Sequence, residues 1–301
     1  MTMPSTVPVL PDAIRIVPAR DWWSWLWASI LVALIGMFIA VIAQSKGVRW
    51  DAIGVYIFDP SIFEGIRLTL QFTVLAMVIG TAIGIVLATM QMSANPVLAG
   101  ISRMYIWFFR GTPLLVQIIF WFNIQLFIPA ISIGAYSIET NSLISAFTAA
   151  LLALSLHEGA YMAEVIRGGL LAVDRGQSEA ATSLGYTPRQ ALTRIVLPQA
   201  MRVIIPPTGN QTISMLKTTS LVSVIAAQDL LTRAENIYAR NFLVIELLMV
   251  AGIWYLVLTT LASVGQLYIE RHFGRSIAAT RSPKSGLMRQ FSAAAFWSKK
   301  S

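Results

Sequence analysis

The sequence predicts an all-α integral membrane protein with about six transmembrane helices, and three observations indicate this fold class. Of the 301 residues, 56 % are hydrophobic and only 12 % are charged, about half the charged fraction of a soluble domain, which is roughly 25 %. The apolar residues gather in runs of about 20, the length that crosses ~30 Å of hydrocarbon. Basic residues are concentrated on one side of these runs, as in multi-pass proteins.

The spans are expected in the following order. The first and last runs are the most uniformly apolar, whereas the fifth is irregular, because Pro206 and Pro207 interrupt it and polar residues follow. A helix break is expected beside Arg110, at residues 111–113 within the third run, where Gly, Thr and Pro follow one another. The expected spans cover residues 22–44, 68–92, 105–127, 143–164, an irregular segment from about 199, and 242–269.

The distribution of Lys and Arg orients these spans. If both termini are cytoplasmic, the inner segments contain most of the basic residues, and cytoplasmic segments of membrane proteins collect positive charge. The net charge of +8 is then a topology signal, and no nucleic-acid partner is expected. We expect a bacterial inner-membrane protein with cytoplasmic tails at residues 1–21 and 271–301. The outer segments hold only Lys46, Arg49, Arg67, Arg233 and Arg240.

Several chemical functions lack the residues that they need. The chain has no Cys and only two His, so neither a disulfide nor a metal site is expected. No GxxxxGK[ST] phosphate loop and no GxSxG serine elbow occurs. His157-Glu158 is not the start of an HExxH zinc motif, because Gly-Ala-Tyr follows. No catalytic residue is therefore expected, and an ATP-independent channel or a secondary carrier for small polar solutes is one open interpretation.

The segment between the fourth and fifth spans is expected to form two short helices joined by a corner. Gly185 can adopt the left-handed conformation that ends a helix. Thr187 is then an N-cap, Pro188 occupies the first helical position, and Gln190 completes a capping box. Pro198 is expected to stop the second helix before the next span. On these physical grounds alone, an ordinary surface loop is an equally good interpretation.

A longer pattern in this segment consists of Glu179, Ala180, Ala181, Gly185, Ile195, Leu197 and Pro198. It resembles the motif of permease subunits of binding-protein-dependent ABC importers, which have the type I importer transmembrane fold. In that family the segment is a cytoplasmic coupling helix that seats in a cleft on the ATPase subunit. The resemblance implies that Glu179 faces a basic group there, that the two alanines allow close approach, and that the glycine sets the corner.

Flanking sequence narrows the resemblance to one branch of that family. Residues 109–115, 159–164 and 217–221 are similar to the polar amino-acid permeases, the histidine, glutamine, glutamate, arginine and opine branch. Thr218 departs from the branch, where an acidic residue is frequent. The resemblance implies a permease domain at residues 64–270, preceded by an additional N-terminal transmembrane helix at residues 22–44.

The resemblance also implies a set of partners. The chain would be a transport subunit without an ATPase site of its own, and a dimer of ABC ATPase subunits would bind ATP and Mg. A second permease, identical or different, would complete the pore in the lipid bilayer. A periplasmic or lipid-anchored solute-binding protein would deliver a polar amino acid or a related small polar solute.

Ionisable groups within the spans are costly unless they face a partner or a cavity. Glu164 is expected to pair with Arg167, three residues further along the helix. Glu158 lies deeper, and it is open whether it makes an interhelical hydrogen bond or contacts a substrate ammonium or guanidinium group. Arg110 is expected to reach the inner headgroups.

Close helix packing and a polar fifth span complete the expectations. Gly80 and Gly84 form a GxxxG pattern, which permits close approach of another helix. The polar residues of the fifth span either line a solute pathway or pack against another subunit. The candidate pathway residues are Glu158, Asn210, Lys217, Thr219 and Ser220.

Overall fold

The structure is a computed structural model that describes residues 22–133 and 136–278. It divides into two units, residues 1–48 and 49–301. In the first unit, α1 (Trp22–Ala43) is one helix that begins with four exposed tryptophans, as suits an anchor at the membrane interface. The tail expected at residues 1–21 lies outside the described residues. Of the tail expected at residues 271–301, residues 271–278 belong to the last helix, α12 (Val244–Ala278), and the rest lies outside the described residues.

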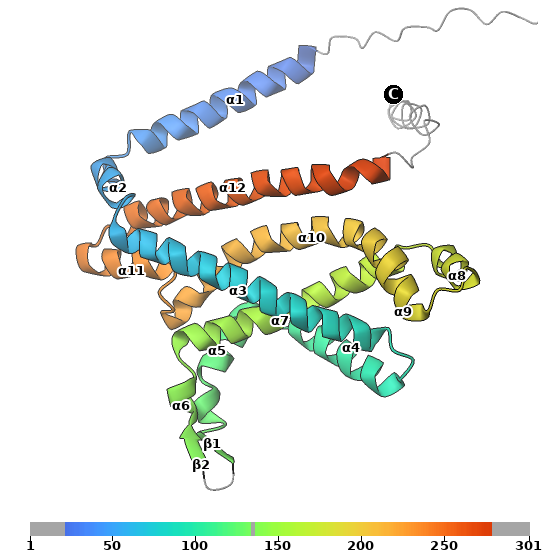
Figure 1. Cartoon of the computed structure of the whole chain (residues 1–301). Helices are drawn as coiled ribbons and strands as arrows, with labels where there is room; N and C mark the ends of the chain where they lie inside the picture. Colours follow the sequence, from blue (N-terminus) through green and yellow to red (C-terminus); the bar gives the residue numbers. More distant parts are fainter. Residues whose placement is uncertain (1–21, 134–135, 279–301) are drawn as a thin grey trace, which may run out of the picture. The chain divides into compact units, whose positions relative to one another are not determined.

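The second unit is built of helices and one short β-hairpin (Figure 1). The strands β1 and β2 are antiparallel, with Ile131 opposite Ile138, and the sequence did not lead us to expect them. The elements are α2 (Trp50–Tyr56), α3 (Pro60–Gln91), α4 (Pro96–Gly111), α5 (Leu114–Phe122), η1 (Ile124–Leu126), β1 (Ala130–Ile133), β2 (Tyr136–Glu139), α6 (Thr140–Leu143), α7 (Ala146–Leu171), α8 (Arg175–Ser183), α9 (Pro188–Ala191), η2 (Leu192–Val196), α10 (Leu197–Thr218), η3 (Thr219–Ile225), α11 (Leu230–Asn241) and α12 (Val244–Ala278).

The all-α membrane fold is confirmed, with fewer uniformly apolar spans than the six expected. Among the described residues, α1, α3, α7 and α12 are long and apolar enough to cross a membrane, and α4 with α5 counts as a fifth span if the bent pair is taken together. The expected fifth span corresponds to α10, which has 22 residues but is too polar to qualify by composition.

The break expected beside Arg110 is confirmed, although the third span starts and ends earlier than predicted. The axes of α4 and α5 differ by 101°. Thr112, which precedes Pro113, is extended, because proline disfavours the helical conformation of the residue before it. The buried Gln117 side chain donates to the carbonyls of Phe109 (3.0 Å) and Thr112 (3.2 Å), and so partners carbonyl groups at the break.

Two expectations about prolines were wrong. Pro206 and Pro207 do not interrupt the fifth span, since α10 continues through both. Pro198 does not stop the preceding helix either, because α9, η2 and α10 follow one another without a gap. Residues 192–196 form a π-helix, whose wider turn changes the hydrogen-bonding pattern just before Pro198, a residue that has no N–H to donate.

The helices α3 and α7 cross in close contact, as the GxxxG pattern predicts. A Cβ atom on Gly80 would lie 2.8 Å from Cβ of Glu158, and one on Gly84 would lie 2.7 Å from Cβ of Met162. The contact is reciprocal, since a Cβ atom on Gly159 of α7 would meet the Ile83 side chain at 2.6 Å. These glycines therefore let the two backbones approach more closely than any other residue would.

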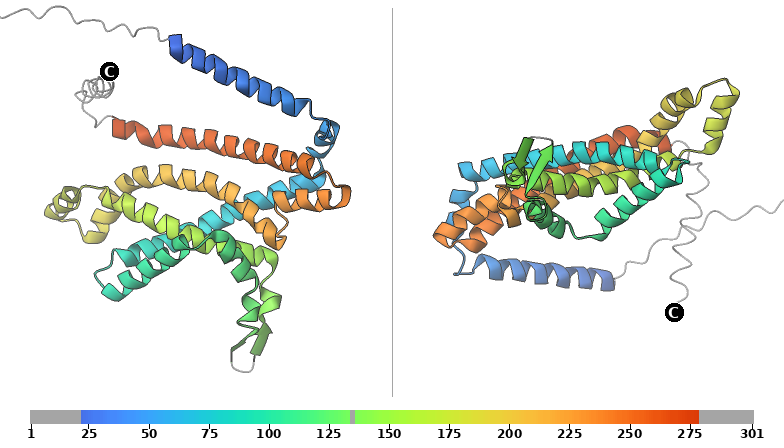
Figure 2. Two further views of the ribbon diagram at one scale, coloured as in Figure 1. Left: turned by 180° about the vertical axis from the view of Figure 1, so that it is seen from behind. Right: turned by 90° about the horizontal axis from the view of Figure 1, so that it is seen from below.

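The main hydrophobic core surrounds this crossing. Phe72 of α3, Ile118 of α5, Leu154 of α7 and Val222 of η3 are fully buried within one cluster. The helix α10 also packs against α7 and α12, and the two views of Figure 2 show the same neighbours. Packing on α7 therefore joins the central elements into one body.

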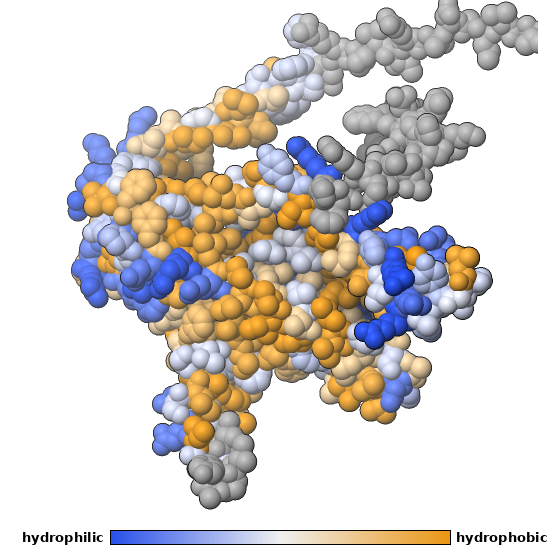
Figure 3. All heavy atoms as spheres, viewed as in Figure 1, coloured by the Kyte–Doolittle hydropathy of each residue, from blue (hydrophilic) through white to orange (hydrophobic). Residues whose placement is uncertain are grey.

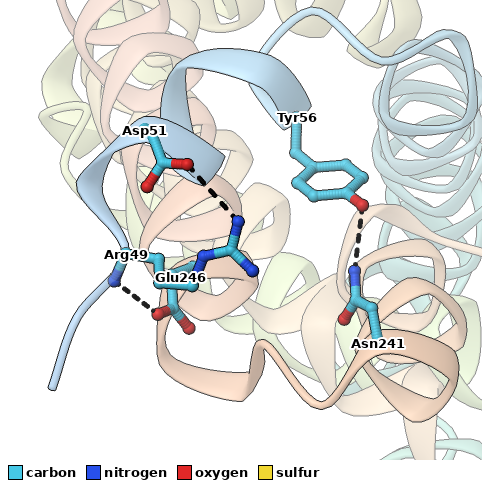
Figure 4. A network of polar contacts seen from close by, with 5 residues as sticks. All are labelled: Arg49, Asp51, Tyr56, Asn241 and Glu246. Carbon is cyan, nitrogen blue, oxygen red and sulfur yellow. Dashed lines mark hydrogen bonds and ion pairs between the residues drawn. The ribbon is translucent and has the colours of Figure 1, made fainter.

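Polar contacts hold the short helix α2 on the beginning of α12 (Figure 4). The backbone N–H of Arg49 donates to the Glu246 carboxylate at 2.8 Å, and the Asn241 amide donates to the Tyr56 hydroxyl at 3.1 Å. The Trp254 indole N–H adds a bond to the carbonyl of Ile57 at 2.8 Å. Within the second unit, the segment from Arg49 to Ile57 is thus fixed at this end of the bundle.

The residue Asp229 joins α11 and α12 at the same end. It is fully buried, caps α11 by accepting from the N–H groups of Leu231 and Thr232, and accepts from the Tyr255 hydroxyl of α12 at 3.2 Å. Burial raises the pKa of its carboxyl group. Thr69 of α3 accepts from the next backbone N–H, that of Leu230, at 3.1 Å.

Hydrophilic residues gather at the two ends of the second unit in Figure 3. One end carries α8 and α9, and the other carries α2 and α11, while hydrophobic residues cover the helices between them. Many large apolar side chains in this middle region are exposed, among them Val74, Val78, Leu256 and Leu261. This pattern is that of a lipid-facing belt.

Replacement of Gly84 should destabilise the α3–α7 crossing. The new methyl group of Gly84→Ala would lie 2.9 Å from the backbone nitrogen of Ala163, so the helices must separate, at a cost of about 1–3 kcal/mol. Thermal unfolding in detergent measures the loss. Gly168→Ala on α7 is the control, because no atom lies within 4 Å of its new Cβ. Equal midpoints for the two variants would contradict the close-contact interpretation.

Candidate functional site

The expected corner forms between α8 and α9. Gly185 has φ +83°. Its N–H donates to the carbonyl of Thr182 at 2.9 Å, and the N–H of Tyr186 donates to that of Ala181 at 3.1 Å, the paired bonds of a glycine-terminated helix end. The predicted capping box is also present, with Thr187 and Gln190 bonded reciprocally. Local sequence signals therefore specify both sides of the corner.

The residues of the expected coupling motif divide into an outward and an inward set. Glu179 and Ala180 are exposed, whereas Ala181 is only 4 % exposed and packs inside the corner. Leu197 and Pro198 are exposed and Ile195 is half-buried on the π-helical turn and the start of α10. Only Glu179, Ala180 and the corner at Gly185 lie at the protruding end of the segment.

Two features of this segment were missed by the sequence analysis. Leu184, directly before the corner glycine, is 78 % exposed, a large apolar side chain at the tip of a polar loop. A cavity of about 500 Å³ lies between α8, α9 and the end of α7, and both Arg175 and Glu179 line it. The position of Leu184 beside Gly185 was the available signal, because a residue next to a tight corner is poorly covered by its neighbours.

The segment is connected directly to α10. The Gln199 side chain donates to the carbonyl of Ile195 at 2.9 Å and to the Gln177 side chain of α8 at 3.3 Å. Because α9, η2 and α10 are consecutive, continuous helical backbone joins the corner to α10.

Along α10, polar side chains line one exposed face. Asn210, Ser214 and Lys217 are all exposed, and their spacing of four and three residues places them on one side of the helix. We call these three residues the polar face of α10. A charged and an amide side chain on a helix surrounded by spanning helices require water or another protein group as partner.

The remaining pathway candidates are not on this face. Glu158 is 3 % exposed and accepts a hydrogen bond from Gln211 of α10 at 3.4 Å, so the interhelical bond considered in the sequence analysis is present. Thr219 is fully buried and Ser220 is half-buried, and each hydroxyl donates to a carbonyl in the preceding turn. In this conformation the candidates therefore do not line one surface.

The charged residues near the end of α7 that leads into α8 form a separate network. Arg167 and Glu164 form the predicted ion pair at 2.7 Å, and Gln91 of α3 donates to the same carboxylate at 3.2 Å. Arg110 lies with its guanidinium carbon 5.1 Å from the centre of the Tyr161 ring, a cation–π contact. These groups hold α3, α4 and α7 together and are already partnered.

The arrangement supports docking and passage of a polar solute. Among the described residues, no group of three or more His, Asp or Glu side chains could hold a metal ion. One end of the bundle offers an exposed corner with an acid and an apolar side chain, and α10 offers a polar face. The two are joined by one continuous run of helix.

Comparison with known proteins identifies the family of this arrangement. Residues 80–275 match the family described as "Binding-protein-dependent transport system inner membrane component". The matched region includes α7, the α8–α9 corner, α10 and most of α12.

Individual relatives agree with this match. The arginine transport system permease protein ArgU of Corynebacterium glutamicum is 42 % identical over 272 residues, 90 % of this chain and 86 % of the relative. The L-cystine transport system permease protein TcyB of Bacillus subtilis is 35 % identical, over 80 % of this chain and 97 % of the relative. A chain of the crystal structure of an amino acid ABC transporter with histidines has a TM-score of 0.66 and 36 % identity, covering 75 % of this chain and 99 % of that one.

Proposed function

The chain belongs to the family of binding-protein-dependent transport system inner membrane components, and on that premise we propose that it carries a polar amino acid across the bacterial inner membrane. It is the multi-pass permease subunit of an ABC importer, and ATP is bound and hydrolysed by a separate subunit. A binding protein supplies the solute to the complex. The observation that supports this function most directly is the exposed corner of α8 and α9 on a run of helix continuous with α10.

The corner has the properties of a docking element for the ATPase. Glu179 offers a carboxylate, Ala180 offers little bulk, and Leu184 offers an apolar side chain that is 78 % exposed. We assign Glu179 to a basic group on the ATPase and Leu184 to an apolar pocket beside it. Gly185 and the capping box fix the shape of the corner, so a movement of the ATPase could be passed on to α10.

The proposed substrate class follows from the relatives and from the polar face. Proteins named for arginine, L-cystine and amino-acid transport are 35–42 % identical to this chain. A free amino acid has a carboxylate and an ammonium group, both of which need partners when they leave water. Lys217 could receive the carboxylate, and Glu158 could receive the ammonium group.

In the described conformation, a solute cannot reach the carboxylate of Glu158, so we interpret this conformation as a closed state of the pathway. Glu158 is buried and bonded to Gln211, so α10 must move relative to α7 before a solute can reach the carboxylate. Asn210 and Lys217 are already exposed and would face a second permease, identical or different, across the pore. Thr219 and Ser220 would then affect the pathway indirectly, because their hydroxyls stabilise the backbone turn at the end of α10.

The topology and the domain division belong to the same proposal. Both termini lie in the cytoplasm, since the inner segments then contain most of the Lys and Arg residues. Residues 64–270 form the permease domain and residues 22–44 an additional anchor. The solute-binding protein, periplasmic or lipid-anchored, docks at the opposite side from α8 and α9.

The substitution Glu179→Lys tests ATPase coupling. It should leave membrane insertion intact but abolish ATP-dependent uptake, because a positive charge would meet the basic group of the ATPase cleft. Uptake by vesicles that contain the purified assembly, with ATP and a panel of amino acids, is the measurement. Normal uptake by the variant would overturn the coupling assignment, and uptake by the unmodified chain without ATP would favour a channel or secondary carrier.

Fusion of alkaline phosphatase tests the topology. The enzyme is active only outside the cytoplasm, so a fusion after Ser301 should be inactive and a fusion at Ser137, in the β-hairpin, should be active. Activity of whole cells is the measurement, with immunoblots as the control for expression. The reverse pattern of activity would exclude cytoplasmic termini.

Substitutions at Glu158 and Asn210 test the pathway. Glu158→Gln and Asn210→Ala should raise the amino-acid concentration for half-maximal uptake by about tenfold, because hydrogen bonds that involve a charged group contribute about 1.5–3 kcal/mol. Assembly and ATP hydrolysis should persist. Glu164→Gln is the control and should lower thermal stability more than apparent affinity, since Glu164 already pairs with Arg167. Unchanged affinity in both pathway variants would leave recognition to the binding protein alone.

A further inference from the structure

The helix α10 is weakened near its middle by its own sequence. Pro206 and Pro207 have no N–H, so the carbonyls of Arg202 and Val203 lack the donors that a regular helix supplies four residues later. Thr208 donates its hydroxyl to the carbonyl of Ile204 at 2.9 Å, a bond that tends to bend helices. A bend at this point would change the direction of the polar face relative to the α8–α9 corner.

A side chain from α12 is bonded to this weak point. Gln266 is 7 % exposed, and its amide N–H groups donate to the carbonyl of Pro206 at 3.0 Å and to Glu270 at 2.9 Å. Nearby hydroxyls of α12 behave differently, since Thr260 and Ser263 donate only to carbonyls one turn earlier in their own helix. Gln266 therefore forms a specific bond between α12 and the prolines.

The glycine at position 209 provides the space for this bond. A Cβ atom on Gly209 would lie 1.5 Å from Oε1 and 2.0 Å from Cδ of Gln266. By contrast, Gly252 of α12 has free space beside it, because no atom lies within 4 Å of a Cβ placed there. Any side chain at position 209 must displace Gln266 from the carbonyl of Pro206 or move α12 away.

Free space lies beside the same point. A groove of about 570 Å³ between α3, α7, α10 and α12 is lined by Gly209 and Gln266, together with Thr81, Ile85 and Thr208. Close-packed side chains do not fill this side of α10, which leaves room for a change in the direction of the helix.

We propose that Gln266 is a positioning residue for transport, which restrains α10 at its two prolines and so aligns the α8–α9 corner with the polar face. With Gln266 in place, α9, η2 and α10 move as one rigid body. Without it, α10 bends at the prolines and a displacement of the corner is lost before it reaches Asn210. This inference rests on the proposed function, since it concerns the step that links ATP hydrolysis to movement of the solute.

The test compares Gly209→Ala, Gln266→Ala and the double variant in the complete assembly, reconstituted in vesicles with its ATPase and binding protein. Each single variant should lower the amount of amino acid taken up per ATP by about fivefold, the effect expected for one lost hydrogen bond. The double variant should be no worse than Gln266→Ala alone, because alanine at position 266 leaves nothing for the new methyl group to displace. Gly252→Ala and Ser263→Ala are the matched controls and should transport normally.

A second readout does not depend on transport. The chain has no Cys, so Arg194→Cys and Val224→Cys introduce two unique label sites, both exposed, on opposite sides of the prolines. Loss of Gln266 should broaden the distribution of distances between the two spin labels, whereas Ser263→Ala should not.

The outcomes distinguish failure of the role of Gln266 from failure of the proposed transport function. Additive losses in the double variant, or an unchanged ratio of uptake to ATP with an unchanged distance distribution, would overturn the role of Gln266. A merely structural role would lower the yield of assembled complex and leave uptake per ATP intact. If the unmodified assembly takes up no amino acid, the proposed function fails. The label distances still decide whether Gln266 restrains α10 at its prolines.

Discussion

The close crossing of α3 and α7 is the contact on which the rest of the bundle depends. Lipid offers no hydrophobic gain when two helices associate, so close packing between small residues must supply the attraction. Gly80, Gly84 and Gly159 allow that approach. The helices α5 and α10 then pack on α7, and the end of α7 leads into the α8–α9 corner. The position of the candidate docking element is thus set by glycines in the membrane.

A second constraint is the need to satisfy backbone groups at membrane depth. Every proline in a spanning segment removes a donor, and a partner must come from elsewhere in the protein. Gln117 supplies it at the break between α4 and α5. At the prolines of α10, Gln266 of α12 donates to the carbonyl of Pro206, whereas the carbonyls that lose a donor are those of Arg202 and Val203.

The sequence predicted features that short-range signals specify. The Thr187–Gln190 capping box and the Gly185 corner follow from neighbouring residues, and the apolar runs follow from composition. Two features depended on contacts distant in sequence and were missed: the continuity of α10 through its prolines and the bond from Gln266. For Glu158 the sequence left an interhelical bond and a substrate contact open, and the structure contains the bond to Gln211. Proline was interpreted from local geometry as a stop, whereas neighbouring helices and a π-helical turn accommodate it.

The polar face of α10 has a consequence for the abundance of this protein in the cell. A single copy in the bilayer would expose Asn210, Ser214 and Lys217 without the partner that assembly provides, and exposure of such groups to hydrocarbon is costly. Binding that favours the folded chain stabilises it by mass action. In the proposed assembly, the amount of folded chain is therefore expected to follow the supply of the partner that covers this face.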